Sequence, residues 1–221
     1  MPGLFIFDFD GTLADTITGI VRSVNAGLAD FGQPPKTQNE VRDNMGRGLR
    51  NLCLWAGKEL PEDRRHELAD RIMVHQRLLW RSHMRVFPGI PQVLQRLRAD
   101  GLKIAVFSNK LNDFAIEVAH GSFPPGTFDL VAGISDLTPA KPAPDSLLHI
   151  ASTLGVAPED TIMVGDMWVD IAAGQAAGMR TIGVTWGYHG EDGFKDQTPW
   201  RLARTPADLL TIYEETLISA S

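Results

Sequence analysis

The strongest constraint on the fold is a short apolar run near the N-terminus that ends in two aspartates. Leu4–Phe7 is entirely apolar, and Asp8-Phe9-Asp10-Gly11-Thr12 follows directly. Such a run is typical of a strand that is buried in a parallel sheet. Because side chains alternate along a strand, Asp8 and Asp10 project to the same side. Paired carboxylates at the carboxyl end of a core strand, where open α/β sheets bind ligands, indicate a metal site or shared acid–base chemistry.

Five apolar runs are predicted to form the strands of one sheet. They are Leu4–Phe7, Lys103–Phe107, Phe128–Ala132, Thr161–Val164 and Thr181–Trp186. Helical stretches that end at glycines separate the later runs. Strands that alternate with helices predict an α/β fold with a doubly wound, parallel, five-stranded Rossmann-like sheet.

The segment between the first two strands is far longer than one crossover helix requires. About ninety residues separate these strands, and residues 15–85 carry helical patterns. A capping-box pattern at Thr37–Glu40 opens one helix, which is expected to run through Leu54. We therefore predict an α/β core domain of residues 1–14 and 86–221, with a helical cap domain of residues 15–85 inserted into it.

Three further polar motifs follow predicted strands. Ser108-Asn109 closes the second strand, Lys141 lies in a proline-rich loop after the third, and Gly165-Asp166-Met167-Trp168-Val169-Asp170 closes the fourth. Each motif alone has an ordinary structural explanation, such as a helix cap, a solvated lysine or a carboxylate that favours a helix dipole. In a parallel sheet, however, the carboxyl ends of the strands meet at one edge, so these residues can converge with Asp8.

The order of these motifs resembles that of the haloacid dehalogenase superfamily, whose phosphatases open with an apolar strand and Asp-x-Asp-Gly-Thr. Members of this superfamily carry a helical cap at the same insertion point, so the resemblance covers nearly the whole chain. Among the capped phosphatases, the chain looks most like phosphoglycolate phosphatases. Dehalogenases of the superfamily lack an acid two residues after the nucleophile, so Asp10 favours phosphoryl transfer.

The resemblance implies a magnesium-dependent phosphatase that hydrolyses a small phosphate monoester through an aspartyl phosphate. The catalytic residues would be Asp8 as the nucleophile, Asp10 as the acid and base, and Lys141 as the neutralising cation. Phosphate or substrate binding would fall to Ser108, Asn109, Lys141, Gly11 and Thr12. Mg²⁺ would be held by Asp8, a backbone carbonyl at Asp10, Asp166 and Asp170.

Two residues outside these motifs are candidates for substrate contact. Arg47 stands between Gly46 and Gly48, in a stretch that interrupts a helical pattern. We expect its guanidinium to bind a second anionic group of the substrate, such as a carboxylate, although a solvated arginine on a bent helix explains it equally well. His189 follows the last predicted strand, and its contact with substrate stays open.

Composition limits the partners. The chain of 221 residues has a net charge of −6 and no block of basic residues, which argues against nucleic acid. It shows no secretory signal and no membrane-spanning segment, and its single cysteine excludes an intramolecular disulfide. We expect a cytoplasmic monomer or homodimer whose partner is a small phosphorylated metabolite.

Other functions remain possible from the sequence alone. A sugar phosphate mutase or a phosphonate hydrolase of the same superfamily would share these motifs. A non-catalytic regulatory or binding module would keep the fold without turnover, although such a relative is expected to lose Asp8 or Asp166, and both are present. The Gly/Pro-rich connection Gly121–Gly126 has no functional interpretation.

Overall fold

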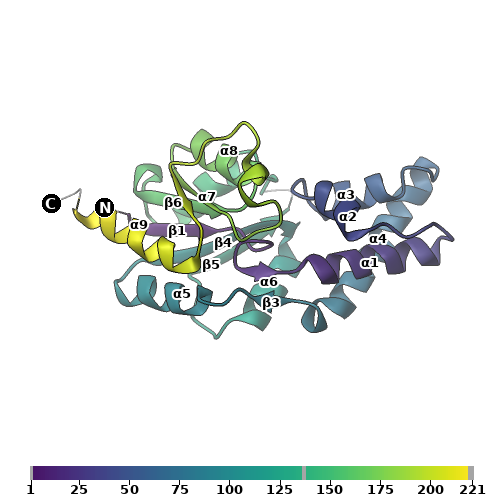
Figure 1. The fold of residues 1–221 in the computed structure, drawn as a ribbon, viewed down its shortest axis with the longest axis horizontal. Helices are drawn as coiled ribbons and strands as arrows, with labels where there is room; N and C mark the ends of the chain where they lie inside the picture. The colour runs from purple at the N-terminus through teal and green to yellow at the C-terminus, as the bar shows by residue number, and fades with distance from the viewer. Residues whose placement is uncertain (1, 136–137, 219–221) are drawn as a thin grey trace. The chain divides into compact units, whose positions relative to one another are not determined.

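A computed structural model describes residues 2–135 and 138–218, and its backbone divides into two compact units (Figure 1). One unit comprises Met1–Ala14 and Val86–Ser221, and the other comprises Asp15–Arg85. The chain passes between the units twice, at two short strands that pair with each other. These strands are β2 (Ala14–Asp15) and β3 (Arg85–Val86).

The first unit is built on a parallel sheet with the order β5-β4-β1-β6-β7-β8. The strands are β1 (Leu4–Phe7), β4 (Lys103–Leu111), β5 (Leu130–Ile134), β6 (Thr161–Gly165), β7 (Arg180–Val184) and β8 (Arg201–Ala203). All four residues of β1 are buried, as a strand covered on both faces requires. The predicted fold class, a doubly wound parallel α/β sheet, is confirmed.

The predicted number of strands was wrong, because the sheet has a sixth strand, β8, at its edge. This strand pairs in parallel with β7. It has only three residues, begins with an exposed arginine, and buries only Ala203 fully. Only its backbone pairing with β7 defines it as a strand, so no apolar run in the sequence could have predicted it.

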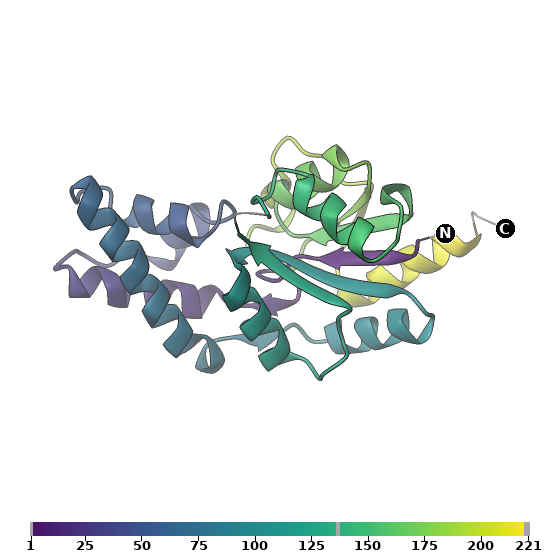
Figure 2. The same ribbon diagram turned by 180° about the vertical axis from the view of Figure 1, so that it is seen from behind.

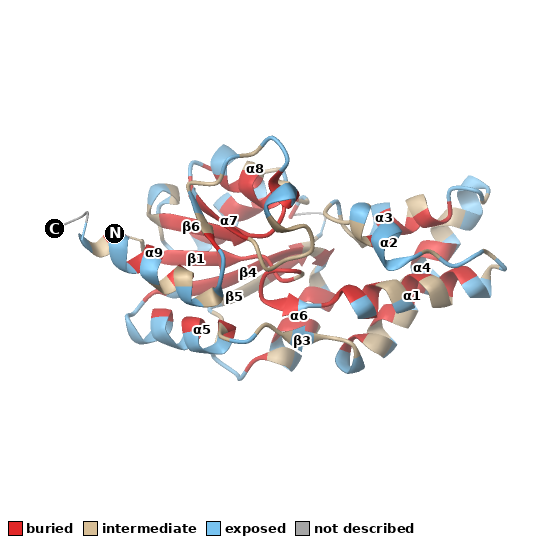
Figure 3. Ribbon diagram, viewed as in Figure 1, coloured by how far each residue is buried: buried red, intermediate tan, exposed pale blue. Residues whose placement is uncertain are grey.

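Helices cover both faces of this sheet (Figures 1 and 2). Helices α7 (Asp145–Thr153) and α8 (Trp168–Ala176) lie on one face, and α5 (Ile90–Ala99), α6 (Asn112–Ser122) and α9 (Pro206–Ile218) lie on the other. Two 3₁₀ turns complete the unit, η2 (Pro158–Asp160) and η3 (Gly190–Phe194). Figure 3 shows that burial is concentrated in the central strands and in the helix faces that pack against them.

The second unit is helical. It contains α1 (Ile17–Asp30), α2 (Gln38–Asp43), α3 (Leu49–Ala56), α4 (Glu62–Leu79) and η1 (Trp80–Ser82). The capping box predicted at Thr37 and Glu40 is confirmed. The single helix expected through Leu54 is instead two helices, because Gly46 (φ 103°) and Gly48 (φ 87°) adopt a backbone conformation that ends α2 and redirects the chain.

Within residues 2–135 and 138–218, no helix has the length and apolar character that a membrane span needs.

Two neighbouring leucines of α7 test how the core is packed. Leu147 is fully buried in a cluster that includes Leu4, Phe107 and Met163, whereas Leu148 is 39% exposed. Leu147→Ala should lower the free energy of unfolding by about 2–5 kcal/mol, because it leaves a cavity. The matched Leu148→Ala variant should lose less than about 1 kcal/mol. Urea unfolding measures both, and equal losses would contradict this packing.

Candidate active site

The register of three central strands brings polar residues to one edge of the sheet. Phe7 of β1 is paired with Val106 of β4 and with Val164 of β6. Asp8 therefore follows directly after β1, and its N–H donates to the carbonyl of Val164 at 2.8 Å. Ser108 and Asp166 each lie two positions beyond the paired valines, so they emerge at the same edge.

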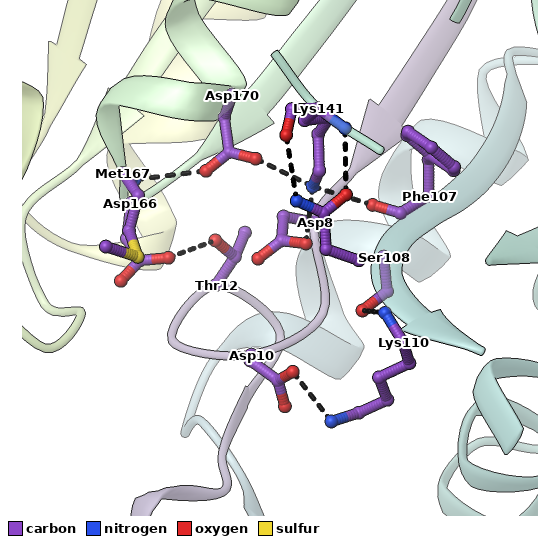
Figure 4. Close-up of polar contacts among 11 residues, drawn as sticks. Asp8, Asp10, Thr12, Phe107, Ser108, Lys110, Lys141, Asp166, Met167 and Asp170 are labelled. Carbon is purple, nitrogen blue, oxygen red and sulfur yellow. Dashed lines mark hydrogen bonds and ion pairs between the residues drawn. The ribbon is translucent and has the colours of Figure 1, made fainter. Parts of the chain in front are cut away.

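A buried lysine connects two carboxylates at this edge (Figure 4). The Nζ of Lys141 lies 2.6 Å from Oδ1 of Asp8 and 2.7 Å from Oδ1 of Asp170. It also donates to the carbonyl of Phe107 at 2.9 Å. Lys141 is only 2% exposed, so these interactions form in a desolvated environment where charge–charge attraction is strong.

The amide of Asn109 holds the backbone at Lys141. The N–H of Lys141 donates to Oδ1 of Asn109 at 2.9 Å, and Nδ2 of Asn109 donates to the carbonyl of Lys141 at 3.1 Å. This reciprocal pair ties the loop that carries the lysine to β4. Asn109 therefore positions Lys141, while its expected contact with phosphate stays a prediction.

Three carboxylates form a close cluster beside the lysine. Asp8, Asp166 and Asp170 each present an oxygen, and these oxygens lie within 4.8 Å of one another. Burial raises the pKa of Asp8 to about 7, since the charges of Asp170 and Asp10 add to the rise and Lys141 opposes it. Burial also raises the pKa of Asp166 well above its ordinary value, with Asp8 and Asp170 contributing. Both carboxyl groups therefore hold a proton at higher pH than an exposed aspartate does.

The lysine responds in the opposite direction. Burial alone would lower the pKa of Lys141, but the carboxylates of Asp170 and Asp8 outweigh it and raise that pKa. Lys141 is accordingly an ammonium at neutral pH. Asp170 also accepts a hydrogen bond from the backbone N–H of Met167 at 3.0 Å, which fixes its carboxylate at the start of α8.

Two segments from other parts of the chain contact the carboxylate of Asp166. The hydroxyl of Thr12 donates to Oδ1 of Asp166 at 3.2 Å, and the N–H of Tyr188 donates to Oδ2 at 3.2 Å. A Cβ at Gly11 or Gly187 would come within 2.3 Å of Oδ2 of the same carboxylate. Both glycines are therefore needed for the close packing that orients Asp166.

The predicted phosphate-binding residues near Asp8 have several partners within the protein. Ser108 is 1% exposed and lies within β4, which continues to Leu111, so the prediction that Ser108-Asn109 closes this strand was wrong. The N–H of Gly11 donates to the carbonyl of Ala14 at 2.9 Å, and this glycine adopts φ 80° in the turn after Asp10. Thr12 contacts Asp166, as described above. Ser108 and Thr12 lie near Asp8 (Figure 4), and the contact of Ser108, Gly11 and Thr12 with phosphate stays a prediction.

Two features of the site were missed from the sequence. Nζ of Lys110 lies 2.7 Å from Oδ2 of Asp10, and Nε1 of Trp186 donates to the carbonyl of Thr12 at 3.0 Å. Lys110 and Asp10 lie 100 residues apart in the sequence, so no local pattern could have identified their contact. Trp186 ends the predicted strand Thr181–Trp186, whereas the observed strand β7 ends at Val184, and nothing in the local pattern of Trp186 indicates the contact with Thr12.

Arg47 belongs to the second unit. It is exposed and lies between α2 and α3, and its carbonyl accepts from Nδ2 of Asn51 at 2.6 Å. Its expected role in substrate binding stays a prediction, as does that of His189.

Comparison with known proteins agrees with the arrangement of these residues. The model of the haloacid dehalogenase-like hydrolase family matches residues 5–184. A phosphoglycolate phosphatase from Psychrobacter arcticus is 33% identical over 198 residues, which cover 86% of each chain. A phosphoglycolate phosphatase from Aquifex aeolicus is 30% identical over 215 residues, covering 97% of this chain and 98% of that protein.

A solved structure gives the same result. A protein from Haemophilus somnus, described as a predicted phosphoglycolate phosphatase, superposes with a TM-score of 0.88 at 26% identity, covering 96% of this chain and 98% of the other. The family match spans most of the chain, and the relatives align over most of their length. The resemblance found in the sequence motifs is therefore confirmed, and the chain belongs to the haloacid dehalogenase-like hydrolase family.

Proposed function

We propose that this protein is a magnesium-dependent phosphatase that hydrolyses a small phosphate monoester through an aspartyl phosphate on Asp8. The observation that carries the proposal is the position of Asp8, buried at the end of β1, with Lys141 on one oxygen and a carboxylate cluster beside it. A carboxylate held next to a cation and a metal site is suited to attack a dianionic phosphate.

The cluster fits a divalent metal ion. If Asp8, Asp166 and Asp170 are all ionised, Lys141 balances only one of their three charges. The donors are hard carboxylate oxygens, which suit Mg²⁺. Burial and the neighbouring carboxylates raise the pKa of Asp8 and of Asp166, and a divalent ion would relieve the repulsion between these carboxylates. When bound, Mg²⁺ would neutralise the phosphoryl oxygens and reduce their repulsion of Asp8.

The first chemical step uses Asp8 and Asp10. A carboxylate oxygen of Asp8 forms a bond to phosphorus while the bond between phosphorus and the ester oxygen breaks. Asp10 donates its proton to the departing alkoxide, which leaves as an alcohol. Lys141, already at 2.6 Å from Asp8, offsets negative charge where it develops.

The second step releases phosphate. The carboxylate of Asp10 takes a proton from water, and the resulting hydroxide oxygen bonds to phosphorus while the bond from phosphorus to Asp8 breaks. This restores the carboxylate of Asp8 and the proton on Asp10, so each group is ready for another turnover. The non-catalytic module considered above would perform neither step.

The proposed substrate class is a small acid that carries both a phosphate and a carboxylate. The names of the Psychrobacter and Aquifex relatives support a substrate like 2-phosphoglycolate. Arg47 is the residue proposed to bind the carboxylate, because a guanidinium matches a carboxylate in a paired, charged hydrogen bond. Phosphoryl transfer to a sugar phosphate or cleavage of a phosphonate would be the competing activities.

The nucleophile is tested by Asp8→Asn. The amide keeps the shape of the side chain but cannot form the phosphoenzyme, so turnover of a nitrophenyl phosphate with Mg²⁺ should fall by about 10³-fold or more. The matched Asp145→Asn variant changes an exposed aspartate in the first turn of α7 and should keep normal turnover. Normal turnover by purified, folded Asp8→Asn protein would refute the assignment.

The metal is tested by its effect on thermal stability. Because the pKa of Asp8 is raised to about 7 in the folded protein, the metal-free protein holds this proton at lower pH and loses stability as the pH rises through about 7. Mg²⁺ competes with that proton, so the increase in Tm on adding Mg²⁺ should be larger at about pH 8 than at about pH 6.

The control for this experiment is Asp166→Asn, which removes one carboxylate of the cluster. It should abolish most of the Mg²⁺-induced rise in Tm at both pH values. A rise in Tm that is the same at both pH values, or that survives in Asp166→Asn, would show that Mg²⁺ binds elsewhere.

The substrate class is tested by Arg47→Ala. This variant should lose about tenfold or more in kcat/KM toward 2-phosphoglycolate, and little toward an uncharged aryl phosphate, because only the former has a carboxylate to bind. Arg50→Ala is the matched control, since Arg50 is an exposed arginine of α3 that pairs with His66. Equal losses on both substrates would mean that Arg47 does not select for the carboxylate.

A further inference from the structure

We propose that Lys110 is a positioning residue that orients the carboxyl group of Asp10 for proton transfer to the leaving group. The inference rests on the function proposed above, in which Asp10 is the acid and base. It adds a residue that belongs to none of the motifs identified in the sequence. The supporting contact is the 2.7 Å ion pair between Nζ of Lys110 and Oδ2 of Asp10 (Figure 4).

The geometry of this pair distinguishes the two carboxyl oxygens of Asp10. An ammonium group donates hydrogen bonds and cannot accept them. Oδ2 of Asp10 therefore accepts from Lys110 whether or not Asp10 is protonated. The proton that Asp10 exchanges with the leaving group then belongs on Oδ1. Lys110 thus determines which oxygen carries the transferable proton and in which direction it points.

Lys110 is itself held in place. Its side chain is only 7% exposed, although the long, charged side chain of a lysine is normally solvated. Its backbone N–H donates to the hydroxyl of Ser108 at 3.4 Å, and its ammonium lies 5.6 Å from the centre of the Phe114 ring. A restrained lysine loses little further side-chain entropy when it orients a partner, so it is an effective positioning group.

The two buried lysines of the site contact different aspartates. Lys141 joins Asp8 and Asp170, whereas Lys110 forms an ion pair with Asp10. Charge neutralisation at the nucleophile and orientation of the acid are therefore assigned to separate residues. Removing Lys110 should impair proton transfer while the contacts of Asp8 are kept.

The consequence is a dependence on the leaving group. A dinitrophenolate leaves without a proton, whereas a simple alkoxide must be protonated as it departs. The ratio kcat/KM reports only the steps up to release of the alcohol, so it excludes the later hydrolysis of the phosphoenzyme. Lys110→Met, which replaces the ammonium by an apolar group of similar length, should lower kcat/KM for ethyl phosphate by about tenfold to a hundredfold. The value for dinitrophenyl phosphate should fall less than about threefold.

A double-mutant cycle tests whether Lys110 acts through Asp10. In the Asp10→Asn background, Lys110→Met should cause no further loss toward ethyl phosphate, because the group it orients can no longer transfer a proton. Lys110→Arg should restore part of the lost activity, since a guanidinium can also donate to Oδ2. Lys103→Met is the matched control, because Lys103 is an exposed lysine at the start of the same strand.

Each other outcome overturns the proposal. Equal losses on both esters would give Lys110 a purely structural role. A loss seen with 2-phosphoglycolate but not with ethyl phosphate would make it a contact for the substrate carboxylate. A further loss in the Asp10→Asn background would mean that it acts independently of Asp10. If wild-type protein hydrolyses none of these esters, the proposed function fails as a whole, which is a separate result.

Discussion

The whole site depends on the ion pairs of one buried lysine. Lys141 lies between Asp8 and Asp170, and without it these carboxylates would be buried beside Asp166 with no positive charge to balance them. A charge left unpaired in a protein interior costs several kcal/mol, so the lysine and the carboxylates must be brought together by the fold. The remaining negative charge makes the same cluster a candidate for a divalent cation.

The sheet supplies the precision that this arrangement needs. Three central strands end in register, so Asp8, Ser108 and Asp166 reach one edge without any long loop. The fourth member, Lys141, comes from a loop, and the amide of Asn109 secures its backbone. Gly11 and Gly187 pack closely against the carboxylate of Asp166. The orientation of this side chain is therefore also fixed by the neighbours that touch it.

The features that could be predicted from the sequence depend on local patterns, and those that could not depend on contacts between distant residues. Asp8, Ser108 and Asp166 could be identified because each comes at the end of an apolar run, and such runs are visible in the sequence. The strand β8 and the pairing of Lys110 with Asp10 could not, because both depend on residues far apart in the chain. A three-residue edge strand has no apolar periodicity, and a lysine in the sequence resembles any solvated lysine until its partner is known.

The central claim is that the phosphoryl group passes through a covalent intermediate on Asp8, and the stereochemistry at phosphorus tests it most directly. A phosphate ester made chiral with three isotopes of oxygen is incubated with the protein and an acceptor alcohol that takes the phosphoryl group in place of water. The configuration at phosphorus is then compared between the starting ester and the ester formed with the acceptor. Two successive in-line displacements, first by Asp8 and then by the acceptor, give net retention. Retention is the result that this account predicts. Inversion would mean that the acceptor attacks the ester directly, and it would contradict the assignment of Asp8 as the nucleophile.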